Sequence, residues 1–187
     1  MWETRDLTCV ILIAVMSFIY TVAVGQLGHL VTGIIWFNYL FTVGHMIFIS
    51  FGFLTYEGKR WRLLLQGVLV ALLTLSTYLS GVPFDLVSKI PMIFTSFFAD
   101  LIFNTFYPFF KKRNWLKWLS ILFSFSFVLL SFLFNTLNIV IFYPPQSLSA
   151  FVSLYALLLP LTLIETALGG WFGFEIYKRV ERPQGTK

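Results

Sequence analysis

The stretch TSFFADLIFNTFYPFFKKR, Thr95–Arg113, is an apolar and aromatic run that carries an acid and an amide and ends in basic residues. Asp100 and Asn104 lie four positions apart, so a helix would place them on the same face, one turn from each other. A helix needs about 20 mostly apolar residues to cross the hydrocarbon core of a bilayer. The run from 90 to 109 has that length, and it predicts a membrane span with polar side chains inside it.

The rest of the chain has the same composition as this stretch. Of the 187 residues, 58% are hydrophobic and 11% are charged, whereas a soluble domain averages about 25% charged residues. Backbone polar groups in lipid must bond within the protein, so helices are the expected structure. We therefore predict an all-α integral membrane protein, a single domain over residues 1–187, with six transmembrane helices. The predicted spans are 7–24, 33–55, 62–80, 90–109, 115–141 and 150–177.

The basic residues predict the direction of these spans. If the spans alternate in direction, 12 of the 13 Lys and Arg residues lie on one side, and only Lys89 lies on the other. The positive-inside rule assigns the basic side to the cytoplasm, so both termini are expected there. The loops on the other side are expected at about 25–32, 81–89 and 142–149. The net charge of +5 is explained by contact with membrane lipid, and no nucleic-acid partner is expected.

Three ionisable residues fall near the middle of predicted spans: His45, Asp100 and Glu165. Such a residue costs roughly 2.5–3.5 kcal/mol at the bilayer centre on insertion scales, so each is a candidate for function. Each also has a structural alternative, a hydrogen bond that fixes one helix against another. For Asp100 and Glu165 the sequence leaves both roles open, and for His45 it favours the structural one.

Amide and aromatic residues extend this pattern toward the outer side. Given the predicted span directions, Asn38, Asn135 and Asn138 fall in the outer leaflet, above the three ionisable residues. Aromatic residues at the outer ends are placed to stack on a planar ligand. The pattern predicts a cavity that opens outward and binds a small-molecule substrate. The candidate binding residues are Asn38, His45, Asp100, Asn104, Asn135, Asn138, Glu165, Trp36, Phe84 and Tyr143.

Sequence motifs for catalysis and for cofactor binding are missing. The chain contains no HExxH, GxSxG or CxxC motif and no Gly-rich nucleotide-binding loop with its Lys. His45, Asp100 and Glu165 come from three separate segments without local spacing, which is a weak basis for a metal site. We therefore expect a protein that is not an enzyme and that has no cofactor and no metal.

Four segments together resemble the S components of energy-coupling-factor (ECF) transporters: GKRWRLLLQGVLVALL (58–73), SGVPFD (80–85), ADLIFN (99–104) and IETALGGWFGFEIYKRV (164–180). The resemblance implies a six-helix subunit of a prokaryotic plasma membrane that captures a vitamin or a related micronutrient. It also implies partners, namely a membrane-spanning coupling subunit and a pair of cytoplasmic ATPases. Carried over to the first span, the coupling face would consist of the small residues Ala14, Ser17, Thr21 and Gly25.

Two other functions stay open at this point. The chain would act as a stand-alone proton-coupled carrier if Asp100 and Glu165 relayed protons, because burial favours the neutral form of a carboxyl group. A small intramembrane enzyme acting on lipid is a further alternative, but no motif supports it. The sequence does not identify the substrate.

Overall fold

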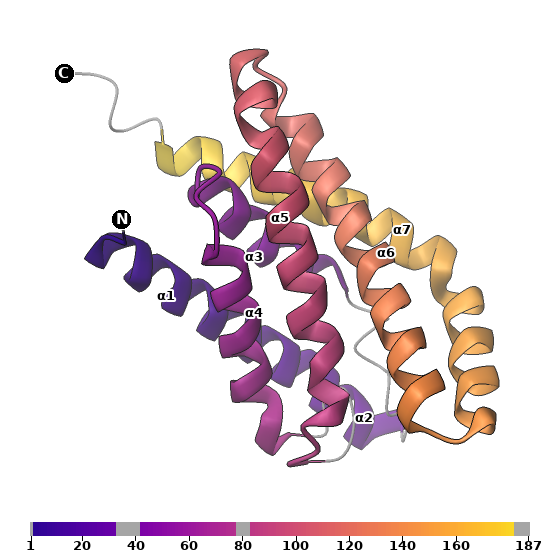
Figure 1. Cartoon of the computed structure of the whole chain (residues 1–187). Coiled ribbons are helices and arrows are strands. Elements are labelled where there is room, and N and C mark those ends of the chain that lie inside the picture. Colours follow the sequence, from indigo (N-terminus) through magenta and orange to yellow (C-terminus); the bar gives the residue numbers. More distant parts are fainter. Residues whose placement is uncertain (1, 33–41, 78–82, 182–187) are drawn as a thin grey trace.

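The computed structural model describes residues 2–32, 42–77 and 83–181, and every regular element within these ranges is helical (Figure 1). This confirms the predicted all-α class. Within the described ranges, four helical segments are long and apolar enough to cross a membrane, whereas the sequence predicted six spans. They are Thr4–Gly25, Val87–Lys112, Leu116–Phe142 and Pro145–Glu181.

The first helix is longer than the sequence predicted. Helix α1 (Thr4–Thr21) continues through a π-helical stretch, Val22–Gln26, into helix α2 (Leu27–Thr32). The predicted loop at 25–32 is therefore wrong. Gly25 and Gly28 suggested a break, but a glycine inside a helix costs only about 1 kcal/mol. Leaving the helix would instead expose backbone groups in apolar surroundings, which costs more.

Helices α3 (Thr42–Thr55) and α4 (Arg62–Leu73) are short, and a 3₁₀ turn, Thr74–Ser76, follows α4. The 14 residues of α3 extend about 21 Å at 1.5 Å per residue, which is less than the roughly 30 Å of a hydrocarbon core. The rest of the second and third predicted spans, at 33–41 and 78–80, lies outside the described residues. Their full lengths therefore stay predictions.

The last three helices follow one another closely. A 3₁₀ turn, Val87–Lys89, leads into α5 (Ile90–Lys112), which is followed by α6 (Leu116–Phe142) and α7 (Pro145–Glu181). The predicted loop at 142–149 is too long, because α7 already begins at Pro145. A proline fits the first position of a helix, where its missing N–H would have no partner in any case.

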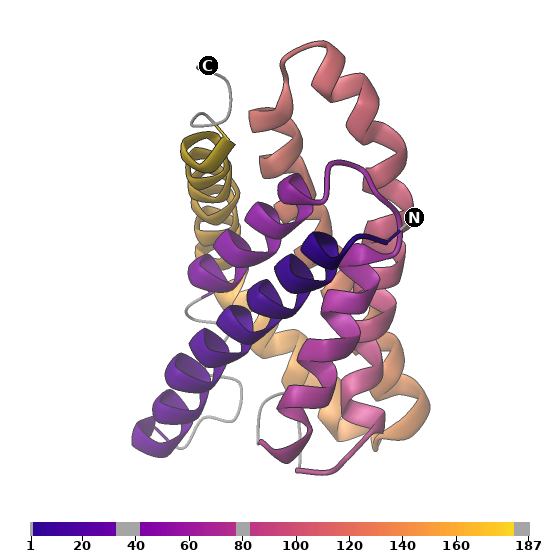
Figure 2. The same ribbon diagram turned by 90° about the vertical axis from the view of Figure 1, so that its left-hand side faces the viewer.

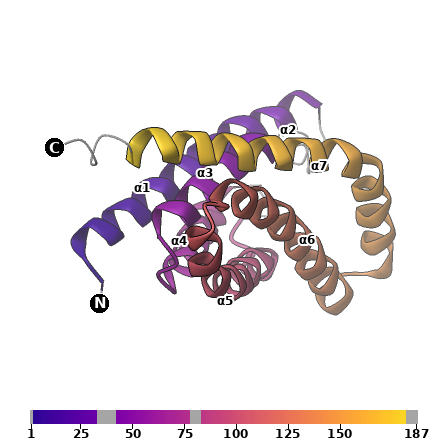
Figure 3. The ribbon, with the colours of Figure 1, turned by 90° about the horizontal axis from the view of Figure 1, so that it is seen from above.

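Helix α7 also contains Pro160, and the helix is bent in Figures 1 and 3. A proline inside a helix removes one hydrogen bond and clashes with the preceding turn, so it bends the helix axis.

Six helices form a closed ring (Figure 3) in the order α1, α4, α5, α6, α7, α3 and back to α1, each packing against its two neighbours. Figure 2 shows α1 lying across α3 and α4. Glycines allow the closest approaches. A Cβ atom on Gly169 of α7 would lie 2.5 Å from Cβ of Met46 on α3, and one on Gly170 would lie 2.7 Å from Oγ of Ser124 on α6.

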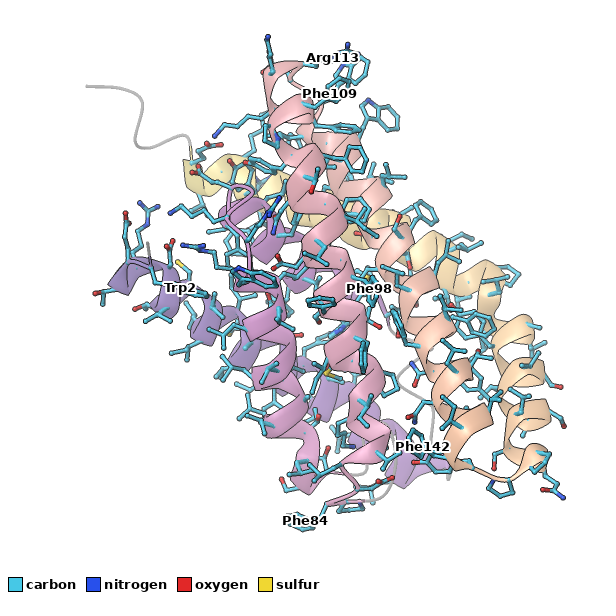
Figure 4. All side chains as sticks on the ribbon, in the orientation of Figure 1. Trp2, Phe84, Phe98, Phe109, Arg113 and Phe142 are labelled. Atoms are coloured by element: carbon cyan, nitrogen blue, oxygen red, sulfur yellow. The ribbon has the colours of Figure 1, made fainter. Side chains whose placement is uncertain are left out.

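The two ends of the ring differ in charge. Arg113 lies at one end, and Phe84 and Phe142 lie at the other (Figure 4). We call the end that contains the turns at 56–61 and 113–115 the basic end. The end that contains residues 83–86 and 143–144 is called the opposite end.

Candidate functional site: a cavity away from the basic end

A cavity lies inside the ring of helices. It contains about 960 Å³ of space free of atoms, a volume that includes the open solvent at its mouth. Its walls include Ser88 and Pro91, next to the start of α5, and Thr74, just after the end of α4. These positions place the cavity toward the opposite end.

The polar side chains in the described cavity wall are all without a permanent charge. Hydroxyl groups come from helices on every side of the ring, and one imidazole and one amide join them. No Asp, Glu, Lys or Arg is among the described lining residues. The polar lining residues are Tyr20, Thr21, Thr42, His45, Thr74, Ser88, Thr95, Ser131, Asn135, Tyr155 and Thr162.

His45 both lines the cavity and holds two helices together. Its Nδ1 lies 2.9 Å from Oγ of Ser17 and 3.4 Å from Oγ1 of Thr21, both on α1. The structural interpretation that the sequence favoured for this residue therefore has a hydrogen-bond partner on a neighbouring helix. The position of His45 in the wall also leaves a binding role open.

The two asparagines of α6 lie in different places. Asn135 lines the cavity, and its Nδ2 donates to the carbonyl oxygen of Ser131 at 2.7 Å and to its hydroxyl at 3.3 Å. Asn138 is buried, but it is not among the residues that line the cavity. Of the predicted pair, the structure therefore brings only Asn135 to the site.

Asp100 lies away from the cavity, at the start of α4. Oδ1 accepts the backbone N–H of Trp61 at 2.9 Å, and Oδ2 accepts those of Leu63 at 2.9 Å and Leu64 at 3.2 Å. Asn104 donates its Nδ2 to Oδ1 at 2.8 Å. The first N–H groups of a helix have no partner within it, and they favour a negative charge. Trp61, the residue before α4, supplies no side-chain cap, so a carboxylate from α5 takes that role.

Glu165 has a similar position at the start of α3. Its Oε2 accepts the backbone N–H of Thr42, the first residue of that helix, at 2.7 Å. Glu165 is not among the described residues that line the cavity. Both carboxylates that the sequence placed at a midplane site thus cap a neighbouring helix. Neither carboxylate lines the cavity itself, although Thr42, the hydrogen-bond partner of Glu165, does, and their predicted binding role stays a prediction.

At the basic end, a second carboxylate, Asp6, forms ion pairs with two basic side chains. Its Oδ1 lies 3.0 Å from Nζ of Lys59, and its Oδ2 lies 2.6 Å from a guanidinium nitrogen of Arg62. The Arg62 guanidinium also lies 4.6 Å from the ring centre of Trp2. These contacts tie the start of α1 to the turn before α4, close to the cap that Asp100 provides.

At the opposite end, Tyr143 and Asp85 connect two turns. The Tyr143 hydroxyl donates to Oδ2 of Asp85 at 2.7 Å, and Oδ1 of Asp85 accepts the N–H of Val87. The hydrogen bond from Tyr143 holds the pKa of the Asp85 carboxyl below its usual range. Burial, together with this bond, raises the pKa of Tyr143 to about 12. Neither Tyr143 nor Phe84, which is 73% exposed, lines the cavity.

The proposed coupling face on α1 is turned inward in this structure. Ala14 and Ser17 are fully buried, and Thr21 and Gly25 line the cavity. A partner could not reach Ala14 or Ser17 without a change of conformation. The role of these residues as a coupling face stays a prediction.

Several wall residues were not predicted. Thr95, Tyr155 and Thr162 line the cavity, but a hydroxyl group inside an apolar helix is common and does not by itself indicate a site. The spacing of seven between Tyr155 and Thr162 places them on one helix face, and it is the only signal that the sequence offers. The predicted residues Trp36 and Asn38 lie outside the described residues.

Comparison with known proteins adds no relative: no family model, no curated protein and no solved structure matches this chain. The resemblance to ECF S components therefore rests on the four segments that carry it.

Proposed function

We propose that this chain is the substrate-capture subunit of a micronutrient uptake transporter of the ECF type. On this proposal it is a multi-pass protein of a prokaryotic plasma membrane, with six spans and both termini in the cytoplasm. The observation that carries the proposal is the cavity: a ring of helices surrounds a space, at the end away from the basic clusters, whose mainly apolar wall carries uncharged polar groups. With the basic end in the cytoplasm, this cavity would face the outside.

The contents of the cavity wall favour binding over catalysis. His45 is the one imidazole among the described lining residues, and its Nδ1 already contacts Ser17. General acid–base or nucleophilic catalysis needs a reactive group next to a partner that activates it. The wall offers hydroxyl and amide groups for orienting a ligand, which is what a binding site requires.

The positions of Asp100 and Glu165 also bear on the proton-coupled carrier. Each carboxylate accepts backbone N–H groups at the start of a helix, and neither lines the cavity. A relay would have to break these hydrogen bonds whenever a carboxylate took up a proton. This observation supports a subunit that depends on partners for its energy, namely the coupling subunit and the ATPase pair.

A pair of variants tests the binding role of the cavity. Ser131→Trp places a large side chain in the wall, whereas Leu133→Trp places it two residues further on, at a side chain that is 48% exposed. We expect the wild type and Leu133→Trp in lipid nanodiscs to retain a small metabolite that native mass spectrometry detects. Ser131→Trp should lose it. Retention of the metabolite by folded Ser131→Trp would contradict the proposal.

The transport class and the topology need separate experiments. Affinity purification from the native membrane should recover ATPase subunits, and pH-driven uptake by the isolated chain in vesicles would contradict the proposal. For topology, Cys9→Ala removes the single cysteine, after which Lys59→Cys and Leu86→Cys can be labelled in intact cells. An impermeant maleimide should label Leu86→Cys only.

A further inference from the structure

The charge of the cavity wall limits what the cavity can bind. None of the described lining residues carries a carboxylate, an ammonium or a guanidinium group. The segments 33–41 and 78–82, which connect described parts of the chain, contain no Asp, Glu, Lys or Arg in the sequence. They therefore cannot supply a charge to the wall. His45 supplies the one imidazole of the described wall, and its Nδ1 already contacts Ser17.

The charged residues closest to the wall in the sequence already have interaction partners within the protein. Glu165 accepts the N–H of Thr42, and Asp85 accepts the hydroxyl of Tyr143 and the N–H of Val87. Lys89 follows the lining residue Ser88, but it is only 2% exposed, does not line the cavity and has interactions of its own. Among the residues that the structure describes, no fixed charge on the wall is left to neutralise an ionic ligand.

An ion would therefore lose its hydration in this cavity without gaining a counter-charge. Burying an unpaired charge costs several kcal/mol even after the protein relaxes. A neutral polar ligand loses much less, and the hydroxyl and amide groups of the wall can replace its bonds to water. The wall therefore selects against ions.

Thr95 gives this wall a polar group that lacks a partner. Its side chain is 1% exposed and lines the cavity, and its Oγ1 has no hydrogen-bond partner. Seven other threonines in the described helices donate to the carbonyl group four residues earlier; Thr105 on the same helix does so to Leu101 at 2.8 Å. Buried polar atoms are nearly always hydrogen-bonded, so an exception on a cavity wall indicates a missing partner.

We propose that the cavity binds an uncharged polar molecule and that Thr95 forms a hydrogen bond with it. This inference rests on the proposed function, and it adds the class of substrate: neutral at pH 7, with hydrogen-bonding groups and of a size that fits the cavity. Asn135 and His45 complete the polar wall. The Nδ2 of Asn135 is held by Ser131, which leaves its Oδ1 to accept a hydrogen bond from the ligand.

Matched pairs of probes test the charge of the ligand. Each pair shares a ring and differs by one ionised group: nicotinamide with nicotinate, uracil with orotate, and indole-3-ethanol with indole-3-acetate. Binding of each compound to the full chain in nanodiscs is measured at pH 7, together with mass spectrometry of any co-purified molecule. Where either member of a pair binds, we expect the neutral one to bind at least about tenfold more tightly.

Each result of this experiment decides the inference. Tighter binding of neutral members, or a co-purified molecule that is neutral at pH 7, supports it. A charged member that binds as tightly as its neutral partner overturns the inference and leaves the proposed function standing, as does a co-purified ion. If nothing binds and nothing co-purifies, the proposed function itself fails, and the inference fails with it.

A pair of threonine variants tests the assigned contact with whichever neutral compound binds. Thr95→Val keeps the shape of the side chain and removes the hydroxyl group, and it should weaken binding roughly three- to tenfold. Thr105→Val, which removes an exposed hydroxyl group from the same helix, should leave binding unchanged. Equal binding by wild type and Thr95→Val would overturn the role of Thr95.

Discussion

The basic end and the cavity differ in whether their polar groups have partners within the protein. At the basic end, carboxylates are engaged: the buried Asp100 accepts three backbone N–H groups and the amide of Asn104, and the partly buried Asp6 pairs with Lys59 and Arg62. In the cavity wall there is no charge among the described residues, and the Thr95 hydroxyl lacks a partner. Engaged charges fix helices in place, whereas neutral groups around an empty space leave room for a ligand.

Unpartnered oxygens are not confined to the cavity wall. Oδ1 of Asn104 is buried without a hydrogen bond as well, but Asn104 does not line the cavity. The comparison therefore depends on two features together, an unpartnered group and the space beside it. The following variants test whether the polar contacts at the basic end stabilise the fold more than the contacts near the cavity do.

The largest effect is expected for Asp100→Ala. It leaves the N–H groups of Trp61, Leu63 and Leu64 without the acceptor that now caps α4, and each unpaired buried group costs about 1–3 kcal/mol. We expect a loss of about 3 kcal/mol or more in the free energy of unfolding, measured by denaturation in detergent. Asp100→Asn keeps the shape and one acceptor oxygen, so it should lose less. A change below about 0.5 kcal/mol for Asp100→Ala would show that the cap does not stabilise the fold.

Gly169→Ala tests the close contact between α7 and α3, which supplies part of the cavity wall. The added methyl group would lie 2.5 Å from Cβ of Met46, a lining residue, and 2.8 Å from the carbonyl oxygen of Val43. Overpacking of this kind typically costs about 1–3 kcal/mol. Thermal unfolding should show the loss, while Leu168→Ala, at a side chain that is 43% exposed, serves as the control. Equal unfolding midpoints for wild type and Gly169→Ala would mean that α3 and α7 can shift to accommodate the added methyl group.

Glu165→Ala should have a smaller effect than Asp100→Ala. It removes the carboxylate that accepts the N–H of Thr42, and loss of a helix cap typically costs about 0.5–2 kcal/mol. Glu165→Gln retains an oxygen that can accept the same hydrogen bond, so it should be closer to wild type. The measurement is the same denaturation in detergent. If Glu165→Ala destabilised the protein more than Asp100→Ala, the two ends of the ring would not differ as described.

The smallest effect is expected for Tyr143→Phe, which removes the hydrogen bond to Asp85. A bond to a charged group contributes about 1.5 kcal/mol at the lower end of its range, and partial exposure reduces it. Because the bond lowers the pKa of Asp85, its stabilisation is full above the usual carboxyl pKa and is lost as pH falls through the lowered value.

The stability of wild type and Tyr143→Phe should therefore differ at pH 7 and converge in acid, below about pH 4. Thermal unfolding of both proteins from pH 7 to pH 3 measures the difference. A gap that stayed constant over this range would show that the Asp85 carboxylate is not the acceptor that matters.

The local pattern of residues was enough to predict the helical class and most helix positions. Long apolar runs separated by turns such as the one at 56–61 leave few alternatives to helices, because unpaired backbone groups are costly in apolar surroundings. The same pattern misjudged 25–32, where glycines suggested a loop although the helix continues. For the site, sequence reasoning found His45 and Asn135 among the wall residues, since isolated polar residues in apolar runs stand out.

The tertiary structure decided which polar residues share a space. Asp100, Glu165 and His45 are each an ionisable residue in the middle of an apolar run. Asp100 and Glu165 each accept an N–H group at the start of another helix, and only His45 of the three lines the cavity. Thr95 looks like any other helical threonine, and its missing partner is visible only once its neighbours are in place. Helical periodicity determines the face on which a residue lies. The rotation and position of each helix against its neighbours determine what that face meets, because they depend on packing between residues far apart in the chain.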